Sequence, residues 1–70
     1  MNDTLFRQKV AESGLKYKHI CSELGISDGA LIKKRKGKIP YKVVEINALV
    51  KMLHLTASER DDIFDLASTE

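Results

Sequence analysis

The chain has 70 residues, of which 43% are apolar and 31% charged, and its formal net charge at pH 7 is +2. A chain this short can bury one small core, which excludes a second domain. The single cysteine Cys21 excludes an internal disulfide, and Cys21, His19 and His54 lack the spacing of metal ligands, so we expect neither a metal nor a cofactor.

The first predicted element is a helix that ends at Gly14. Leu5, Phe6, Val10 and Ala11 recur at helical intervals, and a glycine at that point is typical of a helix end. Nothing before this helix resembles a signal peptide, and no apolar run approaches the ~20 residues of a membrane span. We therefore expect a soluble, cytoplasmic protein.

Two short helices follow, separated by a tight turn. Gly25 can adopt the left-handed conformation that ends the first of them. Ser27 offers a side-chain oxygen that can cap the second, which is predicted over residues 28–36 and closed by Gly37. The first of the two has an apolar stripe at spacing i, i+3, i+4, i+7, made of Tyr17, Ile20, Cys21 and Leu24.

Two further helices complete the predicted fold. Pro40 suits the lead-in to the fourth helix, and Thr56 followed by Glu59 forms a capping box that starts the last helix near Ala57. This acidic C-terminal helix is predicted over residues 57–67. No segment alternates like a strand, so the sequence predicts one all-α domain over residues 1–70, a compact bundle of about five short helices. The apolar residues of the fourth helix recur at helical intervals and are Val43, Val44, Ile46, Leu49, Val50 and Leu53. Those of the last helix are expected to form an inward stripe and are Ile63, Phe64, Leu66 and Ala67.

Positive charge is concentrated around the end of the third helix. Six of the ten residues from Lys33 to Lys42 are basic, whereas residues 59–70 contain one basic and five acidic residues. Such a cluster can attract phosphates or an acidic protein surface. It can also serve only to keep a small domain soluble.

The stretch from Leu15 to Pro40 resembles the helix-turn-helix of the phage repressor and Cro-type family. The run ELGIS, with Leu31 beyond it and KGK at the helix end, gives the resemblance its specificity. It implies a helix-turn-helix over about residues 16–36 within a phage repressor-like DNA-binding fold. The matching residues are Leu15, Ile20, Cys21, Leu24, Gly25, Ile26, Ser27, Leu31, Gly37 and Pro40.

In that family the early, outward positions of the second motif helix contact base edges, and the flanking segments contact phosphates. The resemblance therefore implies a partner- or DNA-binding face made of Tyr17, Asp28, Gly29, Ile32, Lys33, Arg35 and Lys36. Contacts to phosphate or to an acidic partner are implied for Lys16, Lys34, Lys38 and Lys42.

Three of these positions are poorly suited to reading DNA. Gly29 has no side chain, Ile32 cannot form a hydrogen bond, and Asp28 repels phosphates. If Ile32 is exposed, it suits contact with a protein; if the helix is rotated, Ile32 belongs to the core. The ring of Tyr17 is expected in the apolar stripe, with its hydroxyl at the surface. Cys21 is expected to be a small packing residue and not a catalytic thiol.

The chain also resembles the small regulators of temperate-phage lysis/lysogeny switches, and among them the modulators of repression. That resemblance implies a bacterial cytoplasmic regulator that binds a partner repressor and modulates or blocks its operator binding, with DNA contacted, if at all, directly or within a ternary complex. The alternative is a Cro-like regulator that binds operator DNA itself as a dimer. No catalytic triad or phosphate loop is present, so we expect no enzyme, no small-molecule substrate and no membrane partner.

Overall fold

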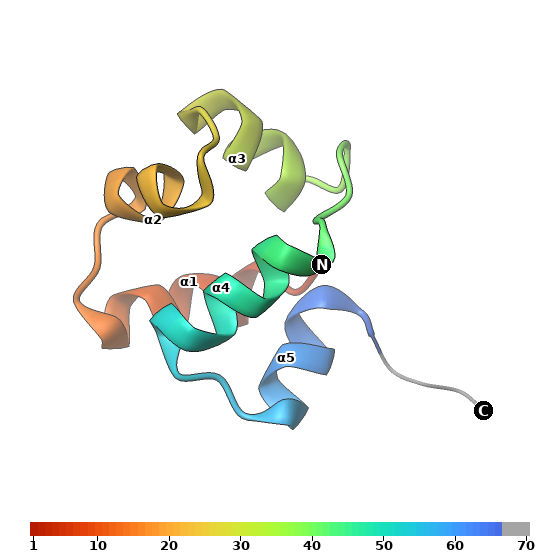
Figure 1. The fold of residues 1–70 in the computed structure, drawn as a ribbon. Coiled ribbons are helices and arrows are strands. Elements are labelled where there is room, and N and C mark those ends of the chain that lie inside the picture. Colours follow the sequence, from red (N-terminus) through yellow and green to blue (C-terminus); the bar gives the residue numbers. More distant parts are fainter. Residues whose placement is uncertain (67–70) are drawn as a thin grey trace.

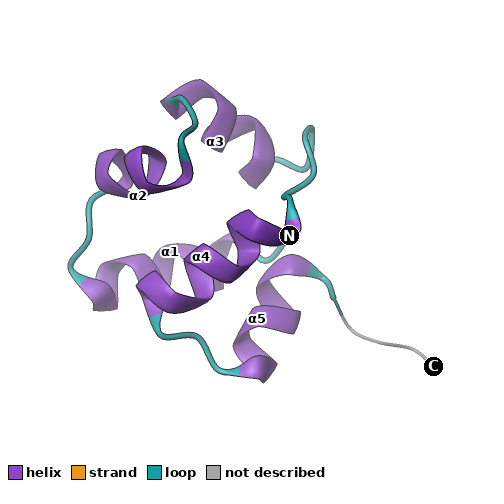
Figure 2. Ribbon diagram, viewed as in Figure 1, coloured by secondary structure: helices purple, strands orange, loops and turns teal. Residues whose placement is uncertain are grey.

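The computed structural model describes residues 1–66 (Figure 1). Five helices account for most of this part of the chain, and it contains no strand (Figure 2). The predicted all-α fold is therefore confirmed. The helices are α1 (Asp3–Ser13), α2 (Tyr17–Leu24), α3 (Asp28–Arg35), α4 (Val43–Leu53) and α5 (Ala57–Phe64).

Local signals set most of the helix ends. Gly14, Gly25 and Gly37 have φ angles of 75°, 69° and 80°, a left-handed conformation that glycine adopts without steric cost. At the start of α5, the Thr56 hydroxyl accepts from the Glu59 amide at 3.1 Å, and the Glu59 carboxylate accepts from the Thr56 amide at 2.9 Å. The predicted capping box is present.

The core lies where α1, α2, α4 and α5 meet. α1 and α4 each pack against α5, α2 packs against α4, and α3 packs against α2 (Figure 1). Phe6, Ile20, Leu49 and Ile63 are fully buried and come from four different helices. Each of these helices therefore contributes apolar area to one cluster. α3 packs against α2 and is held in place through it.

The last two helices depart from the prediction. Asp65 caps α5 in the left-handed conformation, with φ 55°, so α5 ends at Phe64 and Leu66 is exposed. The predicted helix to residue 67 and the inward position of Leu66 are wrong, and Ala67 lies outside the described residues. In α4, Val43 and Val44 are 72% and 70% exposed, because the buried stripe begins with Glu45 and Ile46.

Candidate functional site: the surface of helices α2 and α3

Local hydrogen bonds and two buried side chains, Leu31 and Lys34, fix the orientation of α3. The Ser27 hydroxyl accepts from the Ala30 amide at 3.1 Å, which caps the helix, and the Ile26 amide donates to the Cys21 carbonyl across the turn after α2. Leu31 is buried and holds the helix against the rest of the fold. The opposite side of α3 is exposed and carries Asp28, Gly29, Ile32, Lys33 and Lys36.

Ile32 is the apolar residue of this exposed side. Its side chain is 48% exposed, whereas that of Leu31 is 2% exposed, so Ile32 is not part of the core. Ile32 lines two shallow surface hollows, of about 260 Å³ and about 200 Å³. The larger is also lined by Tyr17, Cys21, Asp28, Leu31 and Arg35, and the smaller by Asp3, Arg35 and Lys36.

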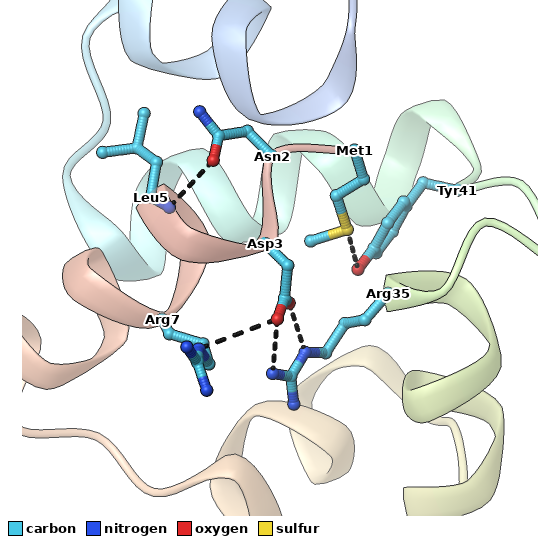
Figure 3. A network of polar contacts seen from close by, with 7 residues as sticks. All are labelled: Met1, Asn2, Asp3, Leu5, Arg7, Arg35 and Tyr41. Atoms are coloured by element: carbon cyan, nitrogen blue, oxygen red, sulfur yellow. Dashed lines mark hydrogen bonds and ion pairs between the residues drawn. The ribbon is translucent and has the colours of Figure 1, made fainter.

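Arg35 connects α3 to α1 and is held within the protein. Its Nε and Nη2 atoms donate to the two carboxylate oxygens of Asp3 at 2.7 and 3.1 Å (Figure 3). Its guanidinium lies 4.9 Å from the ring centre of Tyr17 and 5.6 Å from that of Phe6. The hydrogen bond from Arg35 lowers the pKa of Asp3, and nearby Arg7 adds to the effect. The sequence predicts Arg35 on the binding face, but in the structure its hydrogen bonds to Asp3 chiefly connect α3 to α1.

The position of Lys34 contradicts the prediction that it contacts phosphate or an acidic partner. Its side chain is 5% exposed, and its Nζ lies 3.0 Å from a Glu45 carboxylate oxygen and donates to the Pro40 carbonyl at 3.1 Å. A buried, paired ammonium cannot reach a phosphate or a partner's carboxylate, so the predicted contact role of Lys34 is wrong. Burial opposes ionisation of Glu45, but hydrogen bonds from the Lys42 amide and from Lys34 outweigh it and lower the pKa of that carboxyl.

Five other lysines predicted as contacts lie at the surface. None of these five lysines pairs with an acidic side chain within residues 1–66, so their charge faces solvent. The start of α2 adds two exposed residues that the prediction left out, Lys18 and His19; their positions between the stripe residues Tyr17 and Ile20 could have revealed them. The exposed predicted contacts are Lys16, Lys33, Lys36, Lys38 and Lys42.

The remaining predicted positions are as follows. Tyr17 is 36% exposed and packs its ring beside Phe6, with the centroids 6.3 Å apart. Cys21 is buried, and this burial, with a contribution from Asp28, raises the pKa of the thiol. A raised pKa keeps the thiol protonated and disfavours nucleophilic chemistry, which agrees with a packing role.

Two general features limit the chemistry of this part of the chain. Within residues 1–66, no three His, Cys, Asp or Glu side chains are grouped so that they could hold a metal ion. None of the helices described is long and apolar enough to cross a membrane.

Comparison with known proteins finds no relative: no family model, curated protein or solved structure matches the chain.

Proposed function

We propose that the chain is a phage-type helix-turn-helix regulator of a lysis/lysogeny switch, in which α2 and α3 form the motif. On this proposal it acts in the cytoplasm of a bacterial host by binding a partner repressor and modulating or blocking the repressor's operator binding. Its role is binding and not catalysis.

The observation that carries the proposal is the composition of the exposed side of α3. Ile32 is half exposed between two shallow hollows, and the neighbouring positions offer few groups that read bases. Gly29 contributes no side chain, and the Nε and Nη2 atoms of Arg35 donate to Asp3. An apolar centre surrounded by charged residues is the usual anatomy of a protein-binding patch.

The basic rim gives the proposed partner its chemistry. Lys33 and Lys36 flank Ile32 on α3, and both are exposed. A repressor surface with an apolar recess and nearby carboxylates would complement them, because rim charges steer association and disfavour wrong partners.

Direct operator binding by a Cro-like dimer is the second candidate, and one observation favours it. The unpaired lysines at the start of α2, along α3 and in the loop after α3 could all contact phosphates. Under this candidate the base readout would depend on Asp28, Lys33 and Lys36.

One titration separates the two candidates. Purified protein is mixed with a random pool of labelled duplexes at low and high salt, and bound duplexes are sequenced. We expect weak, strongly salt-dependent binding with no enriched sequence, because lysine contacts to phosphate carry no sequence information. Enrichment of one sequence by the protein alone would overturn the proposed function in favour of the Cro-like dimer.

A second experiment tests the repressor partner directly. Proteins that co-purify from the native host are identified, and an identified repressor is reconstituted with its operator. Adding the chain should release the repressor or change its operator complex in a mobility-shift assay. We expect Ile32→Asp to weaken binding to the repressor by at least about 30-fold, since a charge at the centre of a desolvated patch costs ~2 kcal/mol or more.

The matched control places the same charge elsewhere. Gln8→Asp changes an exposed position of α1 and should bind like the wild type. Circular dichroism should show unchanged helix content in both variants. Binding that survives Ile32→Asp would contradict the role given to α3.

A further inference from the structure

The carboxylate of Asp3 lies between two guanidinium groups at the edge of the surface that carries Ile32 (Figure 3). Its two oxygens accept hydrogen bonds from Arg35 at 2.7 and 3.1 Å, and Nε of Arg7 lies 3.7 Å from one of them. Asp3 is the first residue of α1, yet it lines the smaller hollow together with Ile32, Arg35 and Lys36. A residue from outside α2 and α3 therefore contributes to the proposed binding surface.

This contact occupies the basic side chain that is best suited to bind phosphate. Arg35 is the last residue of α3, and it lines both hollows beside Ile32. A guanidinium binds a carboxylate and a phosphate in the same way, through two parallel N–H groups. Because Nε and Nη2 of Arg35 already donate to Asp3, that edge of the guanidinium is not available to a phosphate. Asp3 therefore withholds the only arginine of the basic segment 33–42 from nucleic acid.

Asp3 also places a negative charge at the surface. Its side chain is 39% exposed, and the larger hollow is lined by a second exposed carboxylate, that of Asp28. Each hollow beside Ile32 therefore has one carboxylate in its lining. A phosphate over Ile32 would meet like charge in both hollows, whereas a protein segment can present N–H groups to the same carboxylates. Unfavourable charges against one class of partner are a common source of specificity.

We infer that Asp3 determines which class of partner this surface accepts: by holding Arg35 and by its own charge, it disfavours nucleic acid relative to protein. The inference rests on the proposed function in that it concerns the same surface. Release of an operator-bound repressor tests the proposed function, whereas the affinity of the chain alone for DNA tests the role of Asp3. Each can therefore fail without the other.

The affinity of the full chain for a labelled duplex of random sequence, measured by fluorescence anisotropy at several salt concentrations, tests this role. Asp3→Asn removes the charge and keeps the shape of the side chain, so Arg35 is released to contact phosphate. We expect Asp3→Asn to bind at least about tenfold more tightly than the wild type at low salt. The slope of log affinity against log salt should also become steeper by about one, as for one additional phosphate contact.

Two matched variants separate this effect from a change in net charge. Asp62→Asn removes the same charge from an exposed position on α5 that lines neither hollow, and should change the affinity less than about threefold. Asp3→Asn/Arg35→Gln replaces the pair by two neutral groups and keeps the net charge of the wild type. This double variant should bind DNA like the wild type, because it lacks both the carboxylate and the arginine that the carboxylate withholds. Circular dichroism should show the helix content of the wild type in all three variants.

A measurement on the wild type keeps the test decisive if Asp3→Asn fails to fold. The Nε–H group of Arg35 gives its own resonance in a proton–nitrogen NMR spectrum, and the random duplex is added to labelled wild-type protein. The Arg35 resonance should keep its position, because this group donates to Asp3. The backbone amide resonances of the exposed residues Lys33 and Lys36 should shift as the duplex binds.

Three results would overturn the inference. One is an Asp3→Asn variant that binds DNA no more tightly than Asp62→Asn. Another is a double variant that binds DNA clearly more weakly than the wild type, because Arg35 would then already contact phosphate, or as tightly as Asp3→Asn, because Arg35 would then play no part. The third is an Arg35 Nε–H resonance that shifts in the wild type as the duplex is added.

Discussion

At the scale of single residues, the buried pair of Lys34 and Glu45 is the most consequential contact. It joins the last turn of α3 to the first turn of α4, and the second hydrogen bond of Lys34, to the Pro40 carbonyl, holds the intervening loop. The pair therefore positions the exposed lysines of that loop without touching a partner itself. Its charges are costly to bury alone, and each is stabilised by the other together with a backbone group, the Lys42 amide for Glu45 and the Pro40 carbonyl for Lys34.

Removing either charge should destabilise the fold strongly. We expect Glu45→Gln or Lys34→Met to lower the free energy of unfolding by about 3 kcal/mol, because each leaves the other group buried without its charged partner. The double variant Lys34→Met/Glu45→Leu should recover most of the loss. Urea unfolding followed by far-ultraviolet circular dichroism measures all three.

An exposed carboxylate provides the control for this series. Glu12→Gln removes a charge that pairs with Lys9 at the surface, and its unfolding midpoint should stay close to that of the wild type. If the single variants are as stable as the wild type, the Lys34–Glu45 pair does not stabilise the fold. The same holds if the free energy of unfolding of the double variant is no higher than that of the single variants.

At the scale of elements, the predictable features are those that depend on a few neighbouring residues. Glycines in the left-handed conformation end α1 and α2, and the side-chain oxygens of Ser27 and Thr56 cap α3 and α5. Each is a local event with its own sequence signature. The end of α5 was missed because Asp65, which is not a glycine, takes the left-handed conformation there.

The site was predictable in part for the same reason. The sequence placed Ile32 and Lys33 on the α3 face, and both are exposed. Lys34 is misassigned because the basic run is interpreted as one solvated cluster, and Arg35 lines the hollows beside Ile32 but is paired with Asp3. They follow Leu31 by three and four residues and so share its inward side. That spacing was a usable signal, but their partners Glu45 and Asp3 come from distant segments and required the tertiary structure.

The cap of α3 gives a prediction at this scale. Ser27→Ala should cost about 1 kcal/mol of unfolding free energy, since the Ala30 amide loses its acceptor at the start of an eight-residue helix. Ser22→Ala is the control, because Ser22 is exposed in the interior of α2, where alanine is a good helix former. Thermal unfolding of both variants, followed by circular dichroism, should show a lower midpoint for Ser27→Ala only. Equal midpoints would mean that the cap is not needed.

At the scale of the whole molecule, ion pairs between distant segments connect the helices. Asp3 joins α1 to Arg35 of α3, and Lys9 joins α1 to Glu59 at the start of α5. The N-terminal ammonium lies 2.7 Å from Asp65 at the end of α5. α1 is thus linked both to α3, which carries the proposed binding face, and to the acidic helix α5.

This arrangement predicts a loss of stability in acid. The pKa of Asp3 lies below 3.8 because of the hydrogen bond from Arg35. The pKa of Glu45 lies below 4.5 because the hydrogen bonds from Lys42 and Lys34 exceed the cost of burial. In the unfolded chain both groups return to ordinary values, so between the two sets of pKa values the unfolded state binds more protons. The stability that these groups contribute is complete above about pH 5 and is lost as the pH falls through their lowered values.

Urea midpoints measured from pH 7 down to about pH 3 should therefore be level at first and then fall. Asp3→Asn tests the assignment, because it removes one of the linked protons. We expect this variant to be less stable than the wild type at pH 7 but to lose less between pH 5 and pH 3, so that the two curves converge in acid. Parallel curves would show that the Asp3–Arg35 pair does not contribute to the acid sensitivity, and a wild-type midpoint that holds at pH 3 would contradict the lowered pKa values themselves.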